Sequence, residues 1–182
     1  MKATRTLVLA LNALLSFACS NDDADEPDTA PGEFASCSKG ALEPDITTTL
    51  ELAGPGVDPS SGVLTPGEYH ISATYLALKS GKEALANQLA GPVIEELFGM
   101  AGLVAVATSR SSSCASLRTL TVWESEEAMF AFVASPAHVR AMAQTLELSR
   151  GTSNTIAWKG NAGSATWQEA ARQLKAEAGG EI

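Results

Sequence analysis

Two histidines, His70 and His138, are the residues of this chain best suited to acid–base chemistry. Imidazole titrates near neutral pH and also binds haem iron, so either residue could act as a pocket base or an axial ligand. A structural role is the alternative for each. His138 follows the Ser135-Pro136 pair and could bond backbone groups at that corner, and His70 could lie in water at the start of a strand. The sequence leaves both interpretations open.

Four further residues are candidates for the wall of a ligand pocket, namely Trp123, Phe132, Tyr75 and Arg118. Trp123 ends a predicted strand, where its ring adds burial and its N–H needs one partner. Tyr75 could donate a hydrogen bond to a bound ring, with core packing as the alternative. We expect Arg118 to be a solvated residue at the rim.

Sequence motifs of the common nucleophilic, nucleotide-dependent and zinc enzymes are missing: there is no G-x-S-x-G, phosphate loop, dinucleotide fingerprint or H-E-x-x-H. Neither Cys37 nor Cys114 has His or Cys at metal-ligand spacing, so no metal site is predicted. No cofactor is predicted, and haem is the alternative. A cofactor-free oxygenase would need an apolar pocket around an oxidisable aromatic molecule and a base, which His138 or His70 would supply.

The first nineteen residues have the pattern of an export signal. Two basic residues precede an apolar run at residues 7–18, and Cys19 follows. The run is too short to span a bilayer as a helix. A Cys at this place resembles a bacterial lipoprotein signal, in which the thiol is acylated, although Ser16 stands where such signals usually have Leu. We therefore predict a cell-envelope protein anchored through Cys19 on the periplasmic side, at the outer membrane. A secreted protein cleaved near Ala18 is the alternative.

The composition limits the partners of the chain. There are 12 Lys and Arg against 21 Asp and Glu, a net charge of -9. Because phosphate binding needs a basic surface, nucleic acid is not expected as a partner. Electrostatic adhesion to anionic lipid is also disfavoured, so membrane attachment would depend on acyl chains. If Cys19 is acylated, Cys37 and Cys114 remain, and two thiols in an oxidising compartment predict a disulfide.

Four regions follow along the chain. Residues 1–19 are the signal with its lipid-modified Cys, and residues 20–36 are acidic and predicted to be a disordered tether. Residues 37–67 are punctuated by Gly and Pro and form a lead-in segment that packs on the domain. Residues 68–182 form the domain itself.

The pattern of apolar residues predicts the elements of the domain. Strands are expected over residues 69–78, 103–110, 117–123 and 152–159, and helices over 82–98, from Ser125 onward, and over 167–178. The first helix should kink or break at Gly91-Pro92. Ser125 should cap the second helix, and Ser135 should cap a new turn after a break at Pro136. Beyond it the apolar stripe continues through Val139, Met142, Ala143 and Leu146.

This order of elements predicts an α+β fold, a ferredoxin-like βαββαβ sandwich with an extra C-terminal helix. Helices would cover one face of its antiparallel sheet, and the other face must also be buried. A second subunit stacked sheet to sheet is the expected cover, which predicts a homodimer. The C-terminal helix or residues 37–67 could cover this face instead and give a monomer.

The stretch LTVWESEEAMFAF at residues 120–132, followed by Ser135-Pro136-Ala137-His138, resembles the antibiotic biosynthesis monooxygenase-like group of the dimeric α/β barrel superfamily. The order of elements matches over residues 69–160. The resemblance implies a domain that binds or oxidises a small aromatic or apolar molecule. The catalytic Trp and His of the haem-degrading branch are replaced here by Phe132 and Met142, so that reaction is not expected. A non-catalytic ligand-binding lipoprotein and a haem-binding protein are the alternatives.

Overall fold

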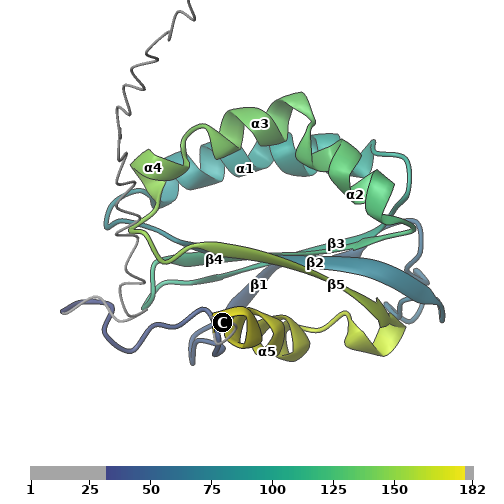
Figure 1. The fold of residues 1–182 in the computed structure, drawn as a ribbon, viewed down its shortest axis with the longest axis horizontal. Helices are drawn as coiled ribbons and strands as arrows, with labels where there is room; N and C mark the ends of the chain where they lie inside the picture. The colour runs from purple at the N-terminus through teal and green to yellow at the C-terminus, as the bar shows by residue number, and fades with distance from the viewer. Residues whose placement is uncertain (1–31, 179–182) are drawn as a thin grey trace, which may run out of the picture.

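The computed structural model describes residues 32–178, so the predicted export signal and most of the predicted tether lie outside the described residues. A five-stranded antiparallel sheet forms the middle layer (Figure 1). Its strands are β1 (Thr47–Ala53), β2 (Glu68–Ala77), β3 (Leu103–Ser111), β4 (Ser116–Trp123) and β5 (Asn154–Asn161). They lie in the order β1-β3-β4-β2-β5. The four predicted domain strands are confirmed, and β1 extends the sheet beside β3.

Helices lie on both sides of this sheet (Figure 1). One face carries α1 (Glu83–Phe98), α2 (Glu126–Val133), α3 (Pro136–Met142) and α4 (Thr145–Leu148). The opposite face carries α5 (Trp167–Ala178), which follows the short 3₁₀ turn η1 (Ala162–Ser164) after β5. The structure confirms the ferredoxin-like α+β arrangement with an extra C-terminal helix.

Helix α1 runs through Pro92 without the break that the sequence predicts. Proline inside a helix costs about 3 kcal/mol, because it removes one backbone hydrogen bond and crowds the preceding turn. Gly91 and Pro92 lie on the exposed side of α1, whereas Leu97 is fully buried and Val93 packs beside it. The apolar side of α1 therefore stays packed on both sides of the proline and keeps the helix in one piece.

The two predicted helix caps have different outcomes. Ser125 accepts the backbone N–H of Ala128 at 3.2 Å, which confirms it as the cap of α2. Ser135 does not cap α3 with its own side chain, because its hydroxyl donates to Glu96 Oε2 at 2.6 Å. The same Glu96 oxygen accepts the backbone N–H of Ala137 at 2.8 Å. Glu96 thus caps α3 from the neighbouring helix α1 and ties the two helices together.

The apolar stripe predicted beyond Pro136 is not part of the core, and this expectation is wrong. Val139 is 47% exposed, Met142 is 45% exposed and Leu146 is 91% exposed. The 3.6-residue period is not carried past Met142, because α3 ends there and α4 begins at Thr145. Leu148, the last residue of α4, is buried instead.

The second face of the sheet is covered by this chain itself. Ala170 and Leu174 of α5 are buried against Ile71, Ala73 and Tyr75 of β2. Residues 38–43 of the lead-in also reach this face, where Glu43 pairs with β4. Of the two covers that the sequence left open, the structure shows the one within the chain. The homodimer stays a prediction, and the argument from an uncovered sheet face no longer supports it.

The start of the packed domain lies earlier than predicted. Cys37 and Cys114 form the predicted disulfide, with their Cα atoms 5.6 Å apart. Phe34 is buried, and the guanidinium of Arg150 lies 4.1 Å from the centroid of its ring. Residues 32–36 form turns, so assigning them to the disordered tether is wrong. Among the described residues, no helix is both long and apolar enough to cross a membrane.

Candidate functional site

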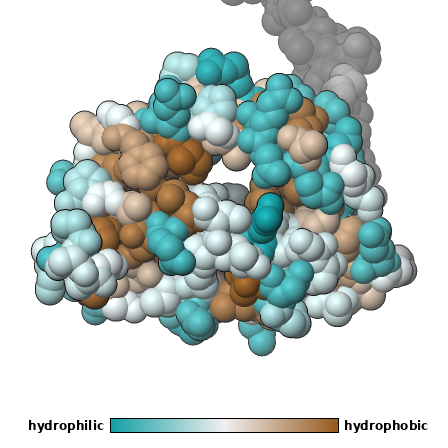
Figure 2. Space-filling model, turned by 180° about the vertical axis from the view of Figure 1, so that it is seen from behind, coloured by the Kyte–Doolittle hydropathy of each residue, from teal (hydrophilic) through white to brown (hydrophobic). Residues whose placement is uncertain are grey.

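A hollow lies between the helix layer and the sheet, and Figure 2 shows its opening on the side of the molecule opposite to Figure 1. A row of threonines crosses all five strands on the sheet face that α1–α4 cover. The threonine row consists of Thr49, Thr108, Thr119, Thr74 and Thr155, in the order β1-β3-β4-β2-β5. Hydroxyl contacts join Thr49 to Thr108 at 2.8 Å and Thr74 to Thr155 at 3.0 Å. Thr119 is paired in register with both Thr108 and Thr74.

A second group of polar side chains lies beside the threonine row on the same face. Ser72 and Thr121 are directly opposite each other on β2 and β4, and their hydroxyls are 2.7 Å apart. The fully buried Trp123 donates its indole N–H to Thr121 Oγ1 at 2.8 Å, so this polar group has a hydrogen-bond partner. β-Branched Thr suits a strand, so the sequence places hydroxyls under the helices without weakening the sheet.

Apolar clusters close the two ends of this polar floor. At one end Leu97, Trp123 and Phe132 pack together between α1, β4 and α2. At the other end Leu85 and Leu89 of α1 belong to a cluster that also includes the strand residues Leu76 and Leu117. The hollow is therefore polar along the sheet and apolar at both ends, a combination suited to a ligand with both kinds of surface.

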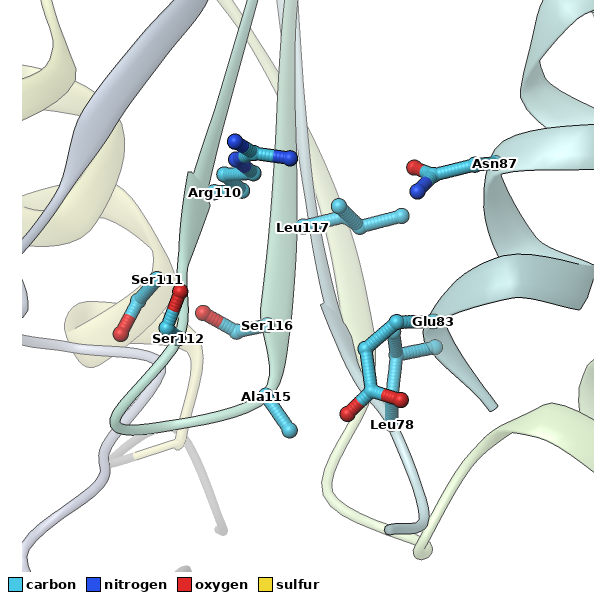
Figure 3. Close-up of a pocket in the computed structure, with 9 residues that line it drawn as sticks. All are labelled: Leu78, Glu83, Asn87, Arg110, Ser111, Ser112, Ala115, Ser116 and Leu117. Atoms are coloured by element: carbon cyan, nitrogen blue, oxygen red, sulfur yellow. The ribbon is translucent and has the colours of Figure 1, made fainter. Parts of the chain in front are cut away.

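A cavity of about 340 Å³ lies between α1 and the β3–β4 hairpin (Figure 3). Figure 3 shows Asn87 extending from α1 toward the strands, Leu117 extending from β4 toward α1, and Arg110 on β3 above them. Arg110 follows Thr108 by two positions, so it belongs to the same face of the sheet as the threonine row. The full lining consists of Leu78, Glu83, Asn87, Arg110, Ser111, Ser112, Ala115, Ser116 and Leu117.

The structure brings three of the predicted site residues together. The rings of Trp123 and Phe132 are stacked with centroids 5.5 Å apart, and Phe132 contacts His138 with centroids 4.6 Å apart. Nδ1 of His138 lies 3.1 Å from the carbonyl oxygen of Val133. A carbonyl only accepts, so a neutral His138 carries its proton on Nδ1. His138 thus makes the backbone contact that its structural interpretation predicts.

His70 lies elsewhere on the same face. It is half-buried on β2, in register with Trp123 on one side and with Lys159 on the other. The pKa of Glu127 at the start of α2 is lowered by its own backbone N–H and the Ser125 hydroxyl, and further by the positive charges of His70 and Lys159. Neither His70 nor His138 lines the cavity of Figure 3.

Tyr75 and Arg118 lie on the opposite face of the sheet, so the four predicted pocket residues do not form one wall. The expectation that Arg118 is a solvated rim residue is wrong, because its side chain is only 2% exposed. Its guanidinium lies 4.5 Å from the centroid of the Tyr75 ring and pairs with Glu43. Residues 38–43 of the lead-in pack over Arg118 and bury it. Sequence reasoning missed Glu43, since a partner 75 positions away leaves no local signal.

A second cavity of about 230 Å³ lies on the α5 face, between β1 and the start of α5, and Leu52 and Trp167 are among the residues that line it. Neither of these two cavities is lined by His, Cys, Met or Tyr, the side chains that ligate haem iron. The cavities therefore do not fit haem. Within residues 32–178, no group of three or more His, Cys, Asp or Glu is arranged to hold a metal ion.

No protein-family model and no curated protein matches the chain. Solved structures do. A proposed monooxygenase from Fusobacterium nucleatum is 10% identical with a TM-score of 0.50, and the match covers 63% of this chain and 50% of that one. A proposed monooxygenase from Lactobacillus acidophilus is 8% identical with a TM-score of 0.49, and the match covers 63% of this chain and 52% of that one. A proposed antibiotic biosynthesis monooxygenase from Nitrosomonas europaea is 9% identical with a TM-score of 0.47, and the match covers 50% of this chain and 89% of that one.

The match spans about half the length of the first two of these proteins. At such identities a structural likeness concerns the fold, and function depends on the site. The chain is thus similar in fold to the proposed monooxygenase from Fusobacterium nucleatum.

Proposed function

We propose that this protein is an exported, lipid-anchored protein of the cell envelope that binds a small molecule in the hollow between α1 and the sheet. The threonine row is the observation that carries the proposal. A hydroxyl placed in an apolar core costs free energy unless it is hydrogen-bonded, so a purely structural helix–sheet interface would be filled by alkyl groups. Here Thr119, at the centre of the row, makes no side-chain hydrogen bond to any residue in the described range 32–178.

The residues that line the cavity are better suited to binding a ligand than to catalysing a reaction. Glu83 and Arg110 are the charged side chains of its lining, and the two histidines that could serve as a base are not among the lining residues. General acid–base catalysis needs the base within hydrogen-bond reach of the reacting group. The aromatic group of Trp123, Phe132 and His138 instead supports one end of the hollow by packing.

The disulfide supports export of the chain. Bonds such as Cys37–Cys114 form and persist in oxidising compartments and are rare in the cytosol. The expected anchor at Cys19 is tested by expressing the full chain with radiolabelled palmitate and separating membrane from soluble fractions. We expect label and membrane association in the parent and neither in Cys19→Ser. Equal labelling of the two proteins would contradict the anchor.

Binding in the hollow is tested with N-phenyl-1-naphthylamine, a neutral aromatic probe whose fluorescence rises in apolar surroundings. The mature chain should bind it saturably. Thr119→Phe should weaken the binding by about tenfold or more, because the new ring occupies the hollow that a ligand must fill. Ala176→Phe, on the exposed side of α5 at the opposite face of the sheet, is the control and should bind like the parent. Absence of saturable binding, or an equal effect of both substitutions, would contradict the proposal.

A further inference from the structure

The geometry points to an anionic ligand: we propose that the molecule bound in the hollow carries a carboxylate or sulfonate-like group that pairs with Arg110. This inference rests on the proposed function and names the chemical class of the ligand. It is carried by the position of Arg110, by its lack of a counter-ion, and by the donors that surround it.

Arg110 lies where a ligand in the hollow would meet it. It is the next residue after Thr108 on the same face of β3, and its register partner is Leu117 of β4. In Figure 3 the guanidinium group of Arg110 lies beside the strands. Leu117 lies below it, and the amide of Asn87 points from α1 toward the strands. A molecule lying along the threonine row would therefore have one end at this arginine.

Among residues 32–178, Arg110 and the exposed Arg140 make no ion pair, whereas the other three arginines are engaged. Arg118 pairs with Glu43, Arg172 pairs with Glu169, and Arg150 donates to the carbonyl oxygen of Leu78 at 2.7 Å. Guanidinium presents a planar fork of donors that matches an oxyanion.

The remaining polar groups of the cavity favour one orientation of the bound ligand. The amide of Asn87 and the hydroxyl of Ser112 add donors to the lining. Glu83 is the acidic residue of the lining, and Figure 3 shows its carboxylate turned toward Leu78, away from Arg110. The cavity thus has a cationic end and an acidic end. An oriented ligand would place its acid group at Arg110 and a hydrogen-bond donor or apolar edge toward Glu83.

Asp45 does not neutralise this site, because its carboxylate is occupied in the adjacent loop. It accepts hydrogen bonds from the hydroxyls of Ser111 and Ser113 and from the backbone N–H groups of Ser112 and Ser113, at 2.6 to 3.0 Å. These contacts hold the β3–β4 loop in place beside the cavity. The cationic charge of Arg110 therefore remains available to a ligand.

The test compares two probes with the same aromatic skeleton on the mature protein. 8-Anilinonaphthalene-1-sulfonate carries a sulfonate, and N-phenyl-1-naphthylamine does not. Arg110→Gln should weaken binding of the sulfonate probe by about tenfold, since one charge-assisted contact is lost, and should change binding of the neutral probe less than twofold. Arg140→Gln, an exposed residue of α3, removes the same charge outside the cavity and should leave both affinities unchanged.

Two further measurements make the outcome decisive. Glu83→Gln should strengthen binding of the sulfonate probe, because it removes a like charge from the cavity. Thr119→Phe should block both probes, which shows that the sulfonate probe occupies the hollow and not an exposed apolar patch. If the neutral probe binds but Arg110→Gln has no effect on the sulfonate probe, or matches Arg140→Gln, the anionic ligand is ruled out. If neither probe binds saturably, the proposed function itself fails.

Discussion

Arg118 and Glu43 form an ion pair of 2.9 Å in which both side chains are only 2% exposed, although 75 positions separate them. Every charge in the pair is compensated. Glu43 also accepts a hydrogen bond from the Ser116 hydroxyl at 2.6 Å, and Arg118 donates to the carbonyl oxygens of Ser38, Lys39 and Ala41. The pair therefore fastens the lead-in to the second face of the sheet, where no solvent reaches it.

Removing one partner of this pair should destabilise the fold strongly. In Glu43→Ala the guanidinium of Arg118 stays buried without a counter-ion, which typically costs about 3–5 kcal/mol of the free energy of unfolding. Urea denaturation followed by circular dichroism measures the change. Glu51→Ala, on the exposed side of β1, is the control and should change the free energy of unfolding by less than about 0.5 kcal/mol. Similar losses in the two variants would contradict a structural role for the pair.

The disulfide should make a comparable contribution. It links residues 77 positions apart, and the chain-entropy model gives about 4 kcal/mol for a loop of this length. We expect the double variant Cys37→Ser, Cys114→Ser to unfold at lower urea concentration by that amount. Thiol titration of the native mature protein should find neither cysteine free before reduction. Two free thiols in the native protein would contradict the bond.

Glu96 should make the stability of the helix layer depend on pH. Its pKa is lowered by the hydroxyl of Ser135, and also by the backbone N–H of Ala137 and the charge of Arg140. Because the pKa in the folded state lies below that in the unfolded state, the ionised carboxylate stabilises the fold above the unfolded pKa. That contribution is lost as the pH falls through the folded pKa.

Glu96→Gln should therefore lower the free energy of unfolding at neutral pH and reduce its fall in acid. Urea titrations from neutral pH down to about pH 3 would measure both effects. Glu95→Gln removes the same charge from the exposed side of α1 and should preserve the acid dependence of the parent. If both variants retain that dependence, Glu96 does not act as the cap of α3.

Leucines of α1 and α4 should respond very differently to substitution. Leu97 is fully buried beside Trp123 and Phe132, so Leu97→Ala should lower the free energy of unfolding by about 2–5 kcal/mol. Leu146 is 91% exposed, so Leu146→Ser should change it by less than about 0.5 kcal/mol. Urea denaturation of the two variants checks the contrast. A large loss in Leu146→Ser would mean that another surface covers α4.

Local patterns in the sequence were sufficient for the elements of the fold. Alternating β-formers marked the strands, Ser125 marked the start of α2, and the apolar period of α1 was correct apart from its continuity through Pro92. The pairing of Cys37 with Cys114 followed from the count of cysteines and the predicted compartment. These features depend on neighbouring residues or on composition, so they can be predicted from the amino-acid sequence alone.

Only the tertiary structure decided which side chains meet. Glu96 caps a helix about forty residues further on, Glu43 of the lead-in neutralises an arginine on β4, and α5 covers the sheet face that a partner was expected to bury. The threonine row likewise exists only because the register aligns one threonine from each of five strands. Such contacts depend on strand order, register and the packing of distant segments, and the sequence by itself determined the elements but not these pairings.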